Sequence, residues 1–136
     1  YNSHLAIHSL IWIYIKQKDF ESAIKVAELA LKNYPQSRIF KWGLARALED
    51  IDSPKAISLY NEILKSYPKN LRSNKINEVT LKHIIAQQLI KINRVSEALK
   101  ICDEILSISN YSKYESDKVS DRIERVKILK KELVQN

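Results

Sequence analysis

The residue types that most often carry out chemistry in proteins are few in this chain. Its 136 residues include three histidines and one cysteine. His4 and His8 are four residues apart, a spacing that places both on one face of a helix and could begin a metal site. No third ligand lies near them in the sequence, so we expect no metal site.

The single cysteine, Cys102, falls on the apolar side of a predicted helix. A nucleophilic cysteine needs an exposed, electropositive site, so we interpret Cys102 as a small buried hydrophobe. The chain has no glycine-rich phosphate loop and no paired-cysteine or His-Glu-x-x-His spacing. We therefore expect a protein that is not an enzyme and that binds no cofactor.

Composition indicates the elements that must position the remaining side chains. One glycine and three prolines are too few for the many turns of a sheet protein, so the chain should be all-α, with long helices and short joints. The longest apolar run near the start, Leu10 to Ile15, is too short to span a bilayer. The chain begins at Tyr1 and contains no methionine, and we expect it to be a fragment of a larger protein.

An internal repeat supplies the architecture. The stretch LKNYP at Leu31 returns as LKSYP at Leu64, 33 residues later. The small residues Ala23 and Ala56 have the same spacing, and a third copy follows at Ala98. The segments before these copies also align, through the set Tyr14, Leu48 and Leu89. A repeat of this length that contains two helical patterns predicts stacked helical hairpins.

Capping signals mark the helix boundaries. We expect N-caps at four side chains that can accept a backbone hydrogen bond: Asp19, Ser37, Ser53 and Asn93. Ser112 and Glu115 have the spacing of a capping box. The apolar residues after that box recur at helical spacing: Val119, Ile123, Val126, Leu129 and Leu133. The predicted single domain, residues 1–136, contains hairpins 4–34, 37–67 and 74–108 and a capping helix 113–135.

These residues resemble the tetratricopeptide repeat family. The resemblance rests on the period near 34 residues, on the small residues Ala23, Ala56 and Ala98, on Phe20, and on the closing Pro35 and Pro68. It implies a right-handed superhelix of antiparallel helical hairpins that serves as a protein-interaction or scaffold module. Ile11 stands where the family usually has a small residue, so we expect it to widen the first helix pair.

Two rows of equivalent residues give the candidate site. In the repeat register, His8 matches Trp42 and His83, and Trp12 matches Arg46 and Gln87. The resemblance implies that both rows face a concave groove, where a peptide or a partner helix would bind. Tryptophan and arginine are enriched at binding hot spots. Packing between helices is the competing interpretation of the two tryptophans.

A basic segment supports an alternative function. Seven of the Lys and Arg residues lie between Lys65 and Arg94, against Glu78 alone, in a chain of formal net charge +7. The candidate patch consists of Lys69, Arg72, Lys75 and Lys82. It would contact nucleic acid or an acidic partner, or simply form a solvated face. Because aromatic residues do not interleave with these lysines, we prefer a protein or peptide partner to nucleic acid. We also expect the chain to be monomeric or weakly self-associating. The sequence indicates no cellular location.

Overall fold

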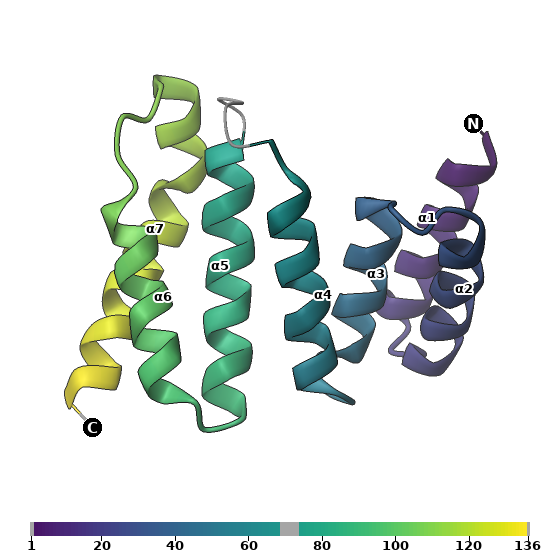
Figure 1. Ribbon diagram of the computed structural model, residues 1–136, viewed down its shortest axis with the longest axis horizontal. Helices are drawn as coiled ribbons and strands as arrows, with labels where there is room; N and C mark the ends of the chain where they lie inside the picture. The colour runs from purple at the N-terminus through teal and green to yellow at the C-terminus, as the bar shows by residue number, and fades with distance from the viewer. Residues whose placement is uncertain (1, 69–73, 136) are drawn as a thin grey trace. The chain divides into compact units, whose positions relative to one another are not determined.

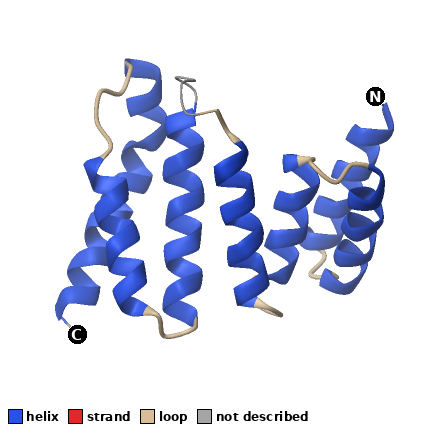
Figure 2. Cartoon of the chain, viewed as in Figure 1, coloured by secondary structure: helices blue, strands red, loops and turns tan. Residues whose placement is uncertain are grey.

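The computed structural model describes residues 2–68 and 74–135 (Figure 1). Its helices are α1 (Asn2–Lys16), α2 (Phe20–Asn33), α3 (Arg38–Leu48), α4 (Ser53–Ser66), α5 (Asn74–Lys91), α6 (Val95–Ser107) and α7 (Lys113–Gln135). No strand occurs in these two ranges, as Figure 2 shows. The all-α prediction is confirmed, and the predicted hairpins and capping helix agree with the observed helices to within a few residues.

The helix contacts divide the chain into two compact units, Tyr1–Ser66 and Tyr67–Asn136. The first unit holds α1 to α4, and the second holds α5 to α7. The prediction of one continuous domain over residues 1–136 stays a prediction.

The first unit consists of the hairpins α1–α2 and α3–α4, with α3 packed against both helices of the first hairpin (Figure 1). Small residues of α2 allow this close packing, and Ala23 and Ala27 are fully buried. Larger core side chains fill the remaining space: Ile11, Phe40, Tyr60 and Ile63 are also fully buried. Burial of such side chains stabilises the unit by about 1.5–3 kcal/mol each.

The chain's single glycine, Gly43, makes room for Ile11. A Cβ atom at Gly43 would lie 2.8 Å from Cγ2 of Ile11, well inside van der Waals contact. The side chain of Ile11 therefore packs against α3 at Gly43, and the expected widening of the first helix pair stays a prediction. Glycine in a helix costs about 1 kcal/mol relative to alanine, and here the close contact explains its presence.

Two predicted N-caps in the first unit are confirmed. Asp19 Oδ1 accepts a hydrogen bond from the backbone N–H of Ser22 at 3.2 Å. Ser37 Oγ accepts one from the backbone N–H of Phe40, also at 3.2 Å. Each cap satisfies a donor of the first helical turn, which has no partner within the helix.

The predicted cap at Ser53 is wrong by one residue. Asp52 Oδ1 accepts the hydrogen bond from the backbone N–H of Lys55 at 3.2 Å. The Ser53 hydroxyl instead donates to the carbonyl oxygen of Glu49 at 2.7 Å and so ties α4 to the end of α3. Asp52 and Ser53 are adjacent and could both cap this helix, and in the structure Asp52 is the cap.

In the second unit, α7 packs against both α5 and α6. Its apolar stripe contributes Val119 and Val126, which are 2% and 0% exposed. The capping box at its start is confirmed: the backbone N–H of Ser112 donates to Glu115 Oε1 at 2.8 Å. The backbone N–H of Glu115 donates to Ser112 Oγ at 3.1 Å in return. This reciprocal pair fixes where α7 begins.

The predicted cap at Asn93 is wrong. Asn93 has a φ of 62°, so it occupies the left-handed region in the turn between α5 and α6. Its backbone N–H donates to the carbonyl oxygen of Ile90 at 3.0 Å, which closes the end of α5. Arg94 takes the N-cap position of α6 and makes no side-chain capping hydrogen bond. Asparagine suits both roles, because its short polar side chain tolerates the left-handed conformation.

Candidate protein-binding groove

A surface hollow of about 300 Å³ lies between α1 and α3 of the first unit. His8 and Trp12 from α1 and Ile39 and Trp42 from α3 line it. Three of these four side chains are candidates from the repeat register, and the fold brings them to one place. Ile39 was missed; it lies three residues before Trp42, a spacing that places both on one helix face. We refer to these four residues as the aromatic hollow.

The tryptophans differ in their surroundings. Trp12 is half-buried, and its ring meets that of His8 edge-on at a centroid distance of 6.3 Å. Trp42 is also half-buried, and its ring meets the buried ring of Tyr60 at 6.3 Å, again edge-on. Trp42 therefore packs against α4 and also lines the hollow, and its role in binding stays a prediction.

His8 carries a polar atom without a hydrogen-bond partner. Its Nδ1 is buried, and no other described group binds it. Leaving such an atom unsatisfied costs about 1–3 kcal/mol. Buried polar groups without a partner are rare in folded proteins and call for a specific explanation.

Arg46 lies on α3 four residues after Trp42. Its Nη1 approaches Glu49 Oε1 at 3.8 Å, and 40% of its side chain stays exposed. The other oxygen of Glu49 accepts a hydrogen bond from the Tyr60 hydroxyl at 2.5 Å. Burial and this hydrogen bond raise the pKa of Tyr60. The guanidinium of Arg46 has further donors beyond the one that faces Glu49, but Arg46 is not among the residues that line the hollow.

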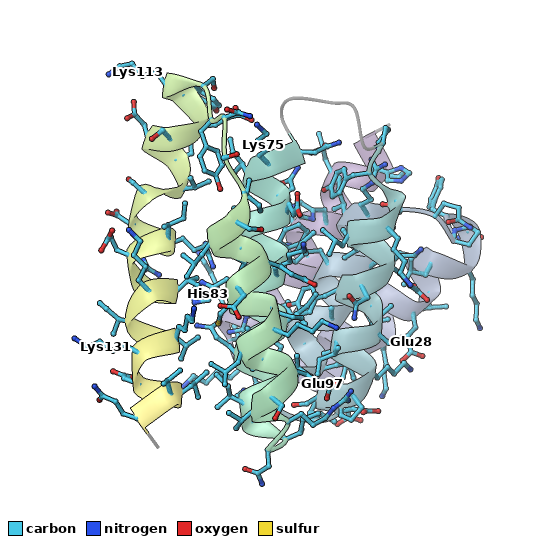
Figure 3. The ribbon with its side chains drawn as sticks, turned by 60° about the vertical axis from the view of Figure 1, so that its left-hand side comes forward. Glu28, Lys75, His83, Glu97, Lys113 and Lys131 are labelled. Carbon is cyan, nitrogen blue, oxygen red and sulfur yellow. The ribbon has the colours of Figure 1, made fainter. Side chains whose placement is uncertain are left out.

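The second unit places His83 away from solvent. The side chain, labelled in Figure 3, is 2% exposed. Its Nδ1 lies 3.0 Å from Nη1 of Arg122 in α7. Burial, followed by the charges of Arg122 and Arg125, lowers the pKa of His83 to about 4. This burial corrects the expectation that His83 lines an open groove, because α7 covers it. Gln87 is exposed on α5.

The candidate basic patch is only partly described, because Lys69 and Arg72 lie outside the described residues. Lys75 donates from Nζ to two carbonyl oxygens in the loop before α7, at 2.8 and 2.7 Å. Lys82 pairs with Glu78 at 2.8 Å and with Glu104 at 3.4 Å. These two ammonium groups thus make contacts within the second unit.

The other residues considered for chemistry, Cys102 and His4, take part in packing. Cys102 is fully buried, and burial raises the pKa of its thiol. His4 stacks on Phe40, with ring centroids 4.9 Å apart. Within residues 2–68 and 74–135, no three His, Cys, Asp or Glu side chains come close enough to hold a metal ion. None of the described helices combines the length and apolarity that a membrane-spanning helix requires.

Comparison with known proteins finds one similarity, which covers most of the first unit. The family model described as tetratricopeptide repeat matches residues 7–37 and 40–70, two adjacent copies. The first copy contains most of α1 and all of α2, and the second contains most of α3 and all of α4. A search of curated proteins found no match.

Proposed function

We propose that the two tetratricopeptide repeats formed by α1 to α4 bind a segment of another protein, as a peptide or a helix, in the aromatic hollow. Tetratricopeptide repeats generally mediate protein–protein interaction or scaffolding, and the family is typically non-enzymatic. One observation carries the proposal: both tryptophans of the chain meet His8 and Ile39 around one surface hollow.

The size of the hollow favours a side chain as its occupant. A volume of about 300 Å³ is at the small end of ligand pockets, and it accepts one large apolar side chain. Burying a Leu or Phe side chain contributes about 1.5–3 kcal/mol, whereas a dissociation constant of about 1 μM requires about 8 kcal/mol. The partner must therefore also contact the surface around the hollow.

Arg46 is the polar candidate in that surrounding surface. Its guanidinium has donors beyond the one that faces Glu49, and it is 40% exposed. A carbonyl or carboxylate of the partner can accept from these donors while an apolar side chain fills the hollow. This combination suits an amphipathic segment with an acceptor about one helical turn from its apolar residue.

The test begins with a peptide-display selection on the 136-residue chain, followed by titration of the selected peptides. Since both tryptophans line the hollow, tryptophan emission reports its occupancy directly, and we expect a shift to shorter wavelength. Trp12→Ala should weaken binding about 30-fold or more, because a hot spot contributes about 2 kcal/mol. Leu29→Ala, at a side chain of α2 that is 61% exposed and outside the hollow, is the matched control.

Equal binding of the selected peptides to the chain and to its Trp12→Ala variant would refute the proposal. Trp42→Ala is a less suitable probe, because the contact of Trp42 with Tyr60 couples binding to the stability of α4. A circular dichroism melt of Trp12→Ala must first show that its helices persist.

A further inference from the structure

A second surface hollow, of about 410 Å³, lies between α6 and α7 of the second unit. Leu106 comes from α6, and the other lining residues come from α7: Lys127, Lys130, Lys131, Val134 and Gln135. We call these six residues the lysine hollow. Leu106 is half-buried and Val134 is 65% exposed, so apolar surface remains open to solvent there. Lysine side chains commonly lay their methylene stems on such a surface and keep the ammonium group in water.

The positive charge of the lysine hollow is only partly neutralised. Lys127 Nζ lies 3.2 Å from Glu124 Oε1, and Lys130 Nζ lies 2.6 Å from Asp103 Oδ1. These four side chains are each at least 41% exposed, and exposed ion pairs contribute little to stability. Lys131, labelled in Figure 3, is exposed and makes no ion pair within the part of the chain that the structure describes. Carboxylates of another molecule can therefore reach these cations.

The helix dipole explains the lysines but not the hollow. Cations near the C-terminus of a helix interact favourably with its dipole, and residues 125–135 of α7 contain four basic residues against Glu132 alone. That effect requires no open apolar surface. Here Leu106 and Val134 line the same hollow as the lysines. The combination favours a ligand that is both apolar and acidic.

We propose that the lysine hollow binds an acidic segment of a partner protein. One apolar side chain of the segment, such as leucine or phenylalanine, fills the hollow against Leu106 and Val134, and the volume accepts one such group. Carboxylates on neighbouring residues of the segment accept hydrogen bonds from the ammonium groups of Lys127 and Lys131. A basic segment would bring like charges together, which disfavours it as the occupant.

This site is distinct from the aromatic hollow and from the candidate basic patch. The aromatic hollow belongs to the first unit, and α7 lies outside the two matched repeats, which end at residue 70. Lys75 and Lys82 of the basic patch direct their ammonium groups to partners within the second unit. Nucleic acid is a poor occupant, because none of the six residues of the lysine hollow is aromatic and could stack on a base.

The test is a peptide-display selection on the 136-residue chain, with counter-selection against its Lys127→Gln, Lys131→Gln variant. Peptides that bind elsewhere, including in the aromatic hollow, bind both proteins and are removed. We expect the surviving peptides to carry a large apolar residue flanked by Asp or Glu. Their affinity is then measured by fluorescence anisotropy, and neutralising both lysines should weaken it at least about tenfold, equivalent to about 1.4 kcal/mol.

Two matched controls accompany this measurement. Lys113→Gln with Lys118→Gln removes the same charge at exposed residues near the start of α7 and should leave binding nearly unchanged. Val134→Ser should weaken binding about fivefold, because the apolar contact is lost. Ile128→Ser is its control, at a side chain of α7 that is 57% exposed and outside the hollow.

Three results would overturn the proposal. The selection enriches no peptide, or the enriched peptides carry no acidic residue, or Val134→Ser and Ile128→Ser bind them equally well. Vesicles containing phosphatidylserine test one other occupant. Binding of the chain to these vesicles that depends on Lys127 and Lys131, without binding of any acidic peptide, would assign the site to a membrane surface. None of these results depends on the aromatic hollow, which Trp12→Ala tests separately.

Discussion

Acidification should weaken the second unit through one residue, His83. Its Nδ1 lies 3.0 Å from the guanidinium of Arg122, so this nitrogen must be unprotonated to accept the hydrogen bond. Protonation would place two cationic donors against each other in a buried site. Burial, Arg122 and Arg125 together lower the pKa of His83 from 6.5 to about 4.

The sign of the pH effect follows from proton uptake. In the unfolded chain His83 binds a proton below pH 6.5, whereas the folded chain resists protonation until about pH 4. The stability linked to His83 is therefore complete above pH 6.5 and declines as the pH falls toward 4. Each pH unit in this window corresponds to about 1.4 kcal/mol, so the loss at pH 5 is about 2 kcal/mol.

Urea unfolding followed by circular dichroism at pH 7, 6 and 5 measures this loss. His83→Gln is the control, because its amide does not titrate and can still accept a hydrogen bond from Arg122. We expect the chain to lose about 2 kcal/mol more than the variant between pH 7 and pH 5. If both proteins lose stability in parallel, His83 is not buried in its neutral form and the reasoning fails.

Three further substitutions test the packing and the joints. Gly43→Ala should lower the free energy of unfolding by about 1–2 kcal/mol, because overpacking against Ile11 exceeds the gain in helix propensity. In an Ile11→Ala background, Gly43→Ala should instead raise the free energy of unfolding. If the effects of the two substitutions are additive in a double-mutant cycle, residues 11 and 43 are not in contact. Lys18 has a φ of 60°, so Lys18→Gly should raise the free energy of unfolding by about 1 kcal/mol, and a thermal melt should show a higher melting temperature. Asn93 has a φ of 62°, and asparagine tolerates this conformation better than lysine does, so Asn93→Gly should raise the stability less than Lys18→Gly. Equal increases in stability for the two variants would argue against relief of backbone strain as the cause.

The sequence predicted the helices and most of their boundaries because those depend on local signals. Asp19, Ser37 and the Ser112–Glu115 box cap their helices as their spacing indicates. The two errors occur where the local signal is degenerate. Asp52 and Ser53 are adjacent and can both cap, and Asn93 can serve equally as a cap or as a left-handed turn residue.

Contacts between helices were harder to predict. The sequence marked Ile11 as an oversized residue, but it did not connect Ile11 with Gly43, which lies 32 positions further along the chain. The pairing depends on the relative register of α1 and α3, and the sequence of neither helix states that register. A lone glycine within a helical pattern was the available signal, because such a glycine often marks a close packing contact.

His8 and His83 show what a repeat register can and cannot predict. They occupy equivalent positions, yet His8 lines an open hollow with Ile39 and Trp42, while His83 is buried beside Arg122. The register fixes the side of its own helix from which each side chain projects. The surroundings come from the next helix to pack there, which is α3 for His8 and α7 for His83. Since α7 has no counterpart in the repeats, its Arg122 could not be aligned with anything. The chemistry of such a site therefore depends as much on the facing helix as on the repeated residue. In the proposed binding site, Ile39 should influence the choice of partner as strongly as His8 does.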